Sequence, residues 1–210
     1  MSELLVRSLA AMAMIALALV AAVLGGYFFA VLVAAAATMM YFEWSRLVRG
    51  WGIGWHAAGF IYALVPALAV LWIREVPNLG LSMIVWVFII VWSTDIGAFF
   101  AGRAIGGPKL APSISPNKTI AGLVGGMASA GLAGWAWVDF ADIPQLFVWL
   151  GPPLALAAQA GDLFESWLKR RANAKDSGTW LPGHGGLLDR VDGLVVVAPL
   201  TAYIFAGLVQ

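Results

Sequence analysis

Residues 80–100 read GLSMIVWVFIIVWSTDIGAFF, an apolar run in which Asp95 is the single charge. A helix of that length extends about 30 Å, which matches the hydrocarbon thickness of a bilayer. Comparable apolar runs lie at about 8–24, 27–42, 57–73, 119–138, 145–161 and 191–209. The pattern therefore predicts an all-α integral membrane protein with about seven transmembrane helices.

The composition agrees with this prediction. Hydrophobic residues make up 62% of the chain, and charged residues make up 11%, against roughly 25% in ordinary soluble domains. The mean hydropathy is +0.90. Because the chain contains no cysteine, disulfide bonds, thiolate metal ligands and a cysteine nucleophile are excluded.

The distribution of Lys and Arg predicts the orientation of the chain. If the spans alternate and the N-terminus is cytoplasmic, Arg74 is the one basic residue out of twelve that falls on the outer side. The positive-inside rule favours this arrangement. We therefore expect a multi-pass protein of the cell inner membrane, with its active site at the cytoplasmic membrane face.

Polar residues are distributed unevenly along the chain. Residues 1–92 carry few of them and are interpreted as an N-terminal transmembrane scaffold. Residues 93–210 are expected to form a catalytic transmembrane domain, with cytoplasmic loops at 102–119 and 162–190. Candidate site residues are therefore sought in this second part.

Charge is concentrated around the second loop. Of the twelve basic and eleven acidic residues, ten lie between 162 and 192, five of each sign. Because these charges cancel, the segment does not attract polyanions in general, and we expect no nucleic-acid partner. Carboxylates and cations placed together are typical of a site that binds a metal ion and phosphate groups. The ten residues are Asp162, Glu165, Lys169, Arg170, Arg171, Lys175, Asp176, Asp189, Arg190 and Asp192.

The first part of this segment has helical spacing. Asp162, Glu165, Ser166 and Lys169 lie three or four residues apart, so they share one face of a helix. Asp162 directly follows an apolar run, which places it near the membrane surface. A site is favoured here over the structural alternative, a solvated helix end with a Glu165–Lys169 ion pair.

Asp189 and Asp192 also lie three residues apart, at the start of the last apolar run. Oxygen ligands at this spacing suit Mg²⁺, which takes one or two carboxylates together with phosphate oxygens and waters. N-capping by Asp189 is the structural alternative, but it leaves Asp192, deeper in the helix, unexplained.

The loop at 102–119 is rich in glycine and proline, which interrupt any regular element. Ser115, Lys118 and Thr119 precede a predicted helix, so two hydroxyls, an ammonium and free backbone N–H groups could converge on an anion. A capped helix start with a snorkelling lysine is an equal alternative.

Asp95 lies within an apolar stretch, where an ionised carboxylate costs several kcal/mol unless it is paired or faces water. It is therefore either a functional residue or the ion-pair partner of Arg103.

These motifs together resemble the signature of the phosphatidate cytidylyltransferase (CDP-diacylglycerol synthase) family. The resemblance rests on SWLKR at 166–170, KDSG at 175–178 and LPGHGGLLDRVD at 181–192, and upstream on DIGAFFAGR at 95–103, SPNKT at 115–119 and GDLFES at 161–166. It covers about residues 90–195. The chain departs from many members in carrying Ala121 where they have glutamate, and in being shorter at the N-terminus with fewer spans.

The resemblance implies the reaction of CTP with phosphatidate to give CDP-diacylglycerol and pyrophosphate in phospholipid biosynthesis. It also implies that magnesium is required, that the active site lies at the cytoplasmic surface of a lipid membrane, and, in many members, that the protein is a homodimer. A phosphate monoester is already ionised at neutral pH, so its attack needs no strong base. Cations around the reacting phosphorus then supply most of the catalysis.

Roles follow for the matching residues. Asp162, Asp189 and Asp192 are expected to hold one or two Mg²⁺ ions. The further catalytic candidates are Lys169, Lys175, Asp176, His184 and Arg190, and the substrate-binding candidates are Asp95, Arg103, Ser115, Lys118, Thr119, Glu165, Ser166 and Arg170.

Two other functions remain open. A CTP-dependent polyprenol or phytol kinase-like enzyme would need a base to activate its lipid alcohol, and the signature argues against it. A transporter would scatter polar residues through several spans, whereas here they collect on one face.

Overall fold

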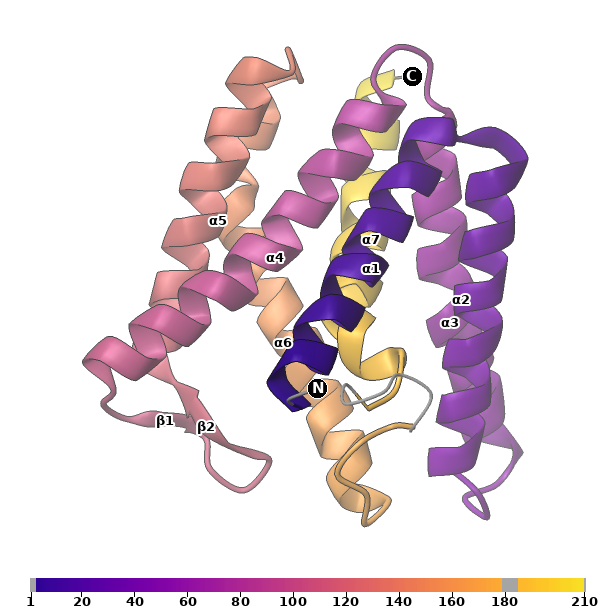
Figure 1. Ribbon diagram of the computed structural model, residues 1–210, viewed down its shortest axis with the longest axis vertical. Coiled ribbons are helices and arrows are strands. Elements are labelled where there is room, and N and C mark those ends of the chain that lie inside the picture. Colours follow the sequence, from indigo (N-terminus) through magenta and orange to yellow (C-terminus); the bar gives the residue numbers. More distant parts are fainter. Residues whose placement is uncertain (1–2, 179–184, 210) are drawn as a thin grey trace.

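The computed structural model describes residues 3–178 and 185–209. Within these residues the chain forms seven α-helices, one short β-hairpin and one 3-10 turn (Figure 1). In chain order they are α1 (Glu3–Leu24), α2 (Gly26–Leu47), α3 (Ile53–Glu75), α4 (Gly80–Ile105), β1 (Lys109–Ala111), β2 (Ser115–Thr119), α5 (Ile120–Phe140), η1 (Gln145–Trp149), α6 (Gly151–Arg171) and α7 (Leu188–Val209).

The predicted all-α membrane architecture is confirmed. Each predicted apolar run lies mostly within a helix, and five helices (α2, α3, α4, α5 and α7) are long and apolar enough to cross a membrane. The apolar part of α1, Met12–Leu24, is shorter. Helix α6 has a suitable length, but its C-terminal half carries Asp162, Glu165 and the basic residues 169–171. The apolar-run rule thus finds all seven helices, although two fall outside the strict criterion for a span.

Helix α4 lies at the centre of the apolar core. Met83, Ile84, Trp86, Val87 and Ile90 are fully buried in its first half, among residues of the neighbouring helices. The indole of Trp86 donates a hydrogen bond to the Gly134 carbonyl of α5, at 3.3 Å.

Small residues bring α4 and α5 into close contact. A Cβ added to Gly125 would lie 2.2 Å from Ala101 Cβ, and one added to Gly97 would lie 2.2 Å from Ser129 Oγ. Such a gap admits only hydrogen on the glycine. In a bilayer, close backbone approach of this kind replaces the hydrophobic drive that water supplies to soluble proteins.

The glycine- and proline-rich loop after α4 is more ordered than the sequence predicted. Strands β1 and β2 pair antiparallel, with Lys109 opposite Thr119 and Ala111 opposite Ser115. The expectation that no regular element forms there is wrong, because the prolines occupy positions that still allow a short, irregular ladder. The hairpin leads directly into α5 and so fixes where Lys118 points.

The charged elements gather at one end of the molecule. In Figure 1 the hairpin, the C-terminal end of α6 and the N-terminal end of α7 all lie at the lower end, as does the α2–α3 turn. Helices α6 and α7 pack closely there, since a Cβ on Gly161 would lie 2.7 Å from the Asp192 carbonyl oxygen. This convergence brings the hairpin loop at 102–119 close to the described part of 162–190, in which residues 162–171 are the end of α6 rather than a loop.

Candidate active site

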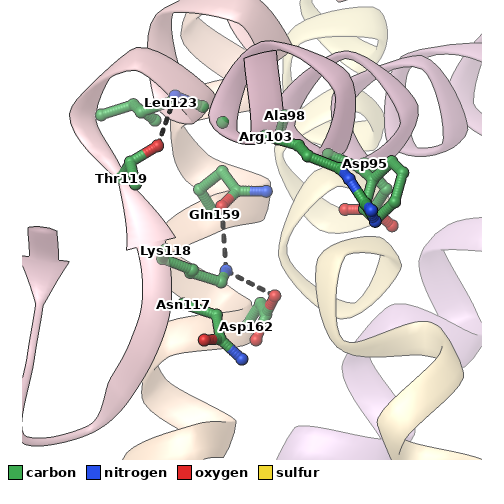
Figure 2. Close-up of a pocket in the computed structure, with 12 residues that line it drawn as sticks. Asp95, Ala98, Arg103, Asn117, Lys118, Thr119, Leu123, Gln159 and Asp162 are labelled. Carbon is green, nitrogen blue, oxygen red and sulfur yellow. Dashed lines mark hydrogen bonds and ion pairs between the residues drawn. The ribbon is translucent and has the colours of Figure 1, made fainter. Parts of the chain in front are cut away.

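Two adjoining cavities open at this end, and both are lined by Asp95 and Asp162. The first has a volume of about 550 Å³ and lies between α4, β2, α5 and α6. Its wall is mixed, because Ala98, Phe99 and Leu123 stand beside charged side chains (Figure 2). The second cavity, of about 310 Å³, is lined by charged residues: Asp95, Asp162, Lys169, Asp176, Asp189, Arg190 and Asp192.

Lys118 enters the first cavity from the end of β2. Its ammonium forms an ion pair with Asp162 and donates a hydrogen bond to Gln159 Oε1 at 2.9 Å (Figure 2). Gln159 is buried on α6. The sequence analysis did not include it, although a glutamine inside an apolar run is the signal that would have found it.

The other residues of the predicted anion clamp lie differently. Thr119 is the N-cap of α5, and its hydroxyl accepts a hydrogen bond from Gly122 N at 3.0 Å, so the capping alternative holds for this residue. It lines the first cavity as well. Ser115 stands at the far end of β2 and lines neither cavity. The structure therefore brings two of the three residues to the cavity.

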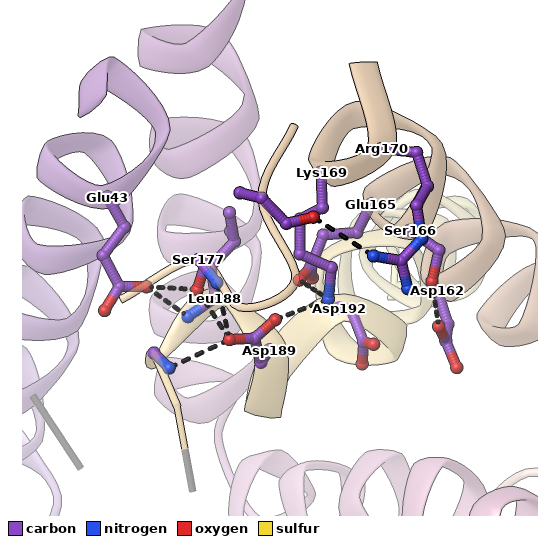
Figure 3. Close-up of polar contacts among 12 residues, drawn as sticks. Glu43, Asp162, Glu165, Ser166, Lys169, Arg170, Ser177, Leu188, Asp189 and Asp192 are labelled. Atoms are coloured by element: carbon purple, nitrogen blue, oxygen red, sulfur yellow. Dashed lines mark hydrogen bonds and ion pairs between the residues drawn. The ribbon is translucent and has the colours of Figure 1, made fainter. Parts of the chain in front are cut away.

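Asp189 is anchored through both of its carboxylate oxygens at the start of α7. Its Oδ1 lies 2.5 Å from Lys169 Nζ. Its Oδ2 accepts hydrogen bonds from the backbone N–H of Ser177 and from Gly186 N, each at 2.9 Å, and lies 2.9 Å from the Ser177 hydroxyl (Figure 3). Both oxygens are thus engaged with the protein, which fixes the carboxylate relative to α6.

Glu165 lies beneath this pair and is almost fully buried, at 1% exposure. Its Oε1 is 3.0 Å from Lys169 Nζ, so the lysine bridges Glu165 and Asp189. Burial raises the pKa of the Glu165 carboxyl to about 9, with the charge of Asp192 adding to the effect and that of Lys169 opposing it. Burial thus favours the protonated form of Glu165.

Asp192 lies one turn deeper in α7. Its Oδ1 accepts a hydrogen bond from Gly193 N at 2.7 Å, and among the described residues it has no ion-pair partner. It faces the same cavity as Asp162 and Asp95.

Oxygen donors are therefore present for a hard divalent cation. Within the described ranges, however, no group of three or more His, Asp and Glu side chains is close enough to hold a metal ion by itself. The arrangement suits Mg²⁺, which takes one or two protein carboxylates and completes its shell with water and phosphate oxygens. Asp192 fits that requirement better than Asp189, because Asp189 is bonded through both oxygens and Asp192 through Oδ1 alone. Asp162 lines the same cavity, but its oxygens contact Lys118 and Ser166, so it could bind a cation only after Lys118 takes another partner.

Some of the remaining predicted residues line the cavities and others do not. Asp176 and Arg190 line the second cavity, and Arg103 lines the first. Ser166 donates to Asp162 Oδ1 at 3.3 Å. Arg170 contacts the backbone carbonyls of Ile114 and Ala174, and the exposed Lys175 lines neither cavity, while His184 lies outside the described residues.

Asp95 does not take the ion-pair partner that was considered for it. Among the described residues no ion pair joins it to Arg103, whose guanidinium carbon lies 6.0 Å from the centroid of the Phe99 ring. Asp95 instead lies where the two cavities meet. The structure thus places Asp95 at the candidate site, and its functional role stays a prediction.

Glu43 is a contributor that the sequence analysis left out of the site. It lies on α2, is fully buried, and accepts hydrogen bonds from Ser177 Oγ, Leu187 N and Leu188 N (Figure 3). An acid near the end of an apolar run, like Asp95, was the available signal. Its partners are more than 130 residues away along the chain, so its contacts could not be foreseen.

The sequence is similar to those of known proteins. The cytidylyltransferase family matches residues 49–208. Proteins named phosphatidate cytidylyltransferase from Brucella suis and Rickettsia bellii are 48% identical over 181 residues and 38% identical over 186 residues. Each alignment covers 84% of this chain, and they cover 64% and 79% of those proteins. The Bacillus subtilis protein of that name is 42% identical over 137 residues, which are 64% of this chain and 51% of that protein.

The chain thus spans about 64% of the length of the Brucella suis relative. The family match includes the helices that carry both cavities. The matched region starts after α2 and continues through α7. With a family match over more than half of its length, this chain belongs to the cytidylyltransferase family.

Proposed function

We propose that the chain catalyses cytidylyl transfer from CTP to phosphatidate, which gives CDP-diacylglycerol and pyrophosphate. The observation that carries the proposal is the pairing of a fully charged cavity with a half-apolar one, joined at Asp95 and Asp162. A triphosphate suits the charged cavity, and a phosphate attached to a lipid suits the half-apolar cavity next to it. The names of the relatives support the same reaction.

The chemistry requires little acid or base catalysis. A phosphate oxygen of phosphatidate attacks the α-phosphorus of CTP, and the bond to the bridging oxygen breaks, so that pyrophosphate leaves with the electron pair. The attacking oxygen is already ionised at neutral pH. The enzyme has to bring two anions together and stabilise charge on the leaving oxygen, which is electrostatic work.

The cations are distributed to do that work. Lys169 and Arg190 line the charged cavity and are assigned to the CTP phosphates. Lys118 lines the mixed cavity beside Ala98, Phe99 and Leu123, and is assigned to the phosphatidate head group. The apolar side of this cavity accommodates the glycerol and the first carbons of the acyl chains.

Lys118 and Asp162 form an ion pair. A phosphate that replaces Asp162 as the partner of Lys118 would free the carboxylate for a cation. Asp162 and Asp192 are the proposed ligands of Mg²⁺, which when bound shields the phosphate charges from each other and from the acids of the cavity. Asp189 is assigned a different part, since it holds Lys169 in place through their 2.5 Å contact.

The membrane placement is part of the proposal. With the N-terminus in the cytoplasm, the end of the bundle that carries Arg103, Lys118 and Lys169 faces the side where CTP is found, in agreement with the positive-inside rule. We infer a multi-pass protein of the inner membrane, active as a homodimer as the family resemblance implies.

The deciding experiment supplies purified protein in mixed micelles with CTP and Mg²⁺, and offers phosphatidate and a polyprenol in parallel. Radiolabelled CDP-diacylglycerol with an equal amount of pyrophosphate is expected from phosphatidate alone. Phosphorylated polyprenol would establish the kinase alternative instead, and the absence of product from either acceptor would refute cytidylyl transfer.

A further inference from the structure

Glu43 is a buried carboxylate without a cationic partner in the described part of the chain. Its side chain has no exposure, yet no Lys or Arg forms an ion pair with it. Burial of an ionised group is costly unless hydrogen bonds replace its water. Here Oε1 accepts from Leu187 N at 2.9 Å, and Oε2 accepts from Leu188 N at 2.8 Å and from Ser177 Oγ at 2.9 Å.

These donors show what Glu43 does locally. Helix α7 begins at Leu188, so Leu187 N and Leu188 N belong to the unsatisfied N–H groups of its first turn. A carboxylate from another helix takes the place of an N-cap side chain there, and the helix dipole favours its negative charge. Glu43 thereby ties the start of α7 to α2.

The same carboxylate is linked to Asp189 through one residue. Ser177 Oγ lies 2.9 Å from both Glu43 Oε2 and Asp189 Oδ2. A hydroxyl carries one proton and donates to one acceptor at a time. Because the backbone N–H of Ser177 already donates to Asp189, the hydroxyl is available to Glu43. The two acids thus bind Ser177 and residues 186–188 from two different helices (Figure 3).

Two glycines of the signature are shaped around Glu43. A Cβ on Gly178 would lie 2.7 Å from Glu43 Oε1, and one on Gly186 would lie 2.5 Å from Glu43 Oε2 and 2.0 Å from Ser177 Oγ. Neither glycine has a positive φ, so space rather than backbone conformation requires them. This is an observation independent of the hydrogen bonds, and it also indicates that the carboxylate has a fixed place.

From these contacts we propose that Glu43 is a positioning residue for the transfer reaction. It fixes the first turn of α7 and the segment before it, so that Asp189 meets Lys169 and Asp192 faces Asp162 across the charged cavity. The inference rests on the proposed function and extends it to a residue outside the matched family region, 49–208.

The isosteric variant Glu43→Gln tests this role. A glutamine has one acceptor oxygen and two N–H donors, so it cannot accept from Leu187 N, Leu188 N and Ser177 Oγ at once. Ser177→Ala is the milder variant, because it keeps both bonds between Glu43 and the α7 backbone and removes only the shared hydroxyl. Glu75→Gln is the matched control, since Glu75 is exposed at the C-terminal end of α3, away from the α2–α3 turn.

Each full-length variant is examined by two measurements. Steady-state rates are determined against CTP and Mg²⁺ in the folded, monodisperse fraction, and amide hydrogen exchange is followed in peptides covering 185–192. For Glu43→Gln we expect kcat to fall by a factor of ten or more, the Mg²⁺ concentration for half-maximal rate to rise, and the amides of Leu187 and Leu188 to exchange at least tenfold faster. Ser177→Ala should show a smaller change in the same direction, and Glu75→Gln none.

Two results would overturn the proposal. One is unchanged kcat and Mg²⁺ dependence in the folded Glu43→Gln protein with only a lower melting temperature, which is a merely structural role. The other is unchanged exchange at Leu187 and Leu188. Exchange is measured without substrate, so it tests Glu43 even if the wild-type protein makes no CDP-diacylglycerol, an outcome that refutes the proposed function instead. If Glu43→Gln does not fold, Ser177→Ala with wild-type kinetics and exchange would equally overturn the proposal.

Discussion

Lys169 Nζ lies 2.5 Å from Asp189 Oδ1, which joins the last turns of α6 to the first turn of α7. The same ammonium lies 3.0 Å from Glu165 Oε1. One cation therefore sets the relative position of the two helices whose acids line the charged cavity.

Replacing Asp189 by Asn is expected to lower the rate of CDP-diacylglycerol formation by about 100-fold, the scale of losing one preorganised electrostatic contact. Asn has one acceptor oxygen and cannot serve Lys169, Ser177 and Gly186 together. The measurement is label transfer from CTP at saturating substrate. Asp142→Asn is the control, since Asp142 is exposed beyond α5 and its positive φ of 52° suits asparagine. Near-normal turnover by the Asp189 variant would refute its assigned part.

Replacing Lys118 by Met is expected to raise the KM for phosphatidate about tenfold, with a smaller effect on the KM for CTP, because Lys118 lines the mixed cavity. The KM is measured as the surface mole fraction of phosphatidate in mixed micelles. Lys109→Met is the control from the same hairpin, as Lys109 is exposed and lines neither cavity. If CTP binding were the one that weakened, the two substrate assignments would have to be exchanged.

Asp192→Asn is expected to raise the Mg²⁺ concentration needed for half-maximal rate, because an amide oxygen is a weaker ligand for a hard cation than a carboxylate. Activity of the wild-type protein should vanish on chelation with EDTA and return with Mg²⁺. Initial rates over a Mg²⁺ titration provide the measurement. An unchanged titration curve in the variant would exclude Asp192 as a ligand.

The raised pKa of Glu165 predicts a particular dependence of stability on pH. In the folded protein burial raises this pKa to about 9, from 4.5 for a free carboxyl. Between these values the folded state binds the proton and the unfolded state does not, so this group's contribution to stability is full below about pH 4.5 and is lost as the pH rises to about 9. Glu165→Gln mimics the protonated acid and should abolish this part of the slope.

Thermal denaturation in detergent from pH 5 to pH 9 tests this sign. The wild-type melting temperature should fall relative to that of Glu165→Gln as the pH rises. Parallel curves for the two proteins would show that Glu165 is ionised in the fold.

Packing of α4 on α5 can be tested without any assay of activity. Gly125→Leu should destabilise the protein by about 1–3 kcal/mol, because its Cβ alone would lie 2.2 Å from Ala101 Cβ. Gly54→Ala should be neutral or stabilising, since nothing lies within 4 Å of a Cβ there. A melting temperature of the Leu variant equal to that of wild type would contradict the close contact between the helices.

The places of the helices were predictable because they follow from local composition. A run of apolar residues as long as a bilayer is thick has to form a helix, since lipid offers no partners for unsatisfied backbone groups. The same argument found α6, whose N-terminal half is apolar and whose charged half starts at Asp162. The hairpin at 109–119 was missed, because a two-stranded ladder among glycines and prolines leaves no periodic pattern.

The candidate site was predictable in its residue types and only partly in its contacts. Helical spacing placed Asp162, Glu165 and Lys169 on one face, and all three lie near the cavities. Spacing could not reveal that backbone donors occupy Asp189, or that Asp192 forms no ion pair within residues 3–178 and 185–209. Nor could it reveal that Gln159 accepts a hydrogen bond from Lys118. Glu43 was passed over because its bonds to Ser177, Leu187 and Leu188 depend on how α2 packs.

The sequence by itself thus determined that the chain is a bundle of apolar helices with a charged, phosphate-suited segment near its C-terminal end. The tertiary structure decided which charges meet, because partners such as Glu43 and Ser177 are 134 residues apart and come together only through helix packing. Such packing depends on glycines such as Gly161, Gly178 and Gly186, where an added Cβ would lie less than 3 Å from atoms of another segment. At that scale a single methyl group changes which atoms touch, and no local pattern in the sequence records it.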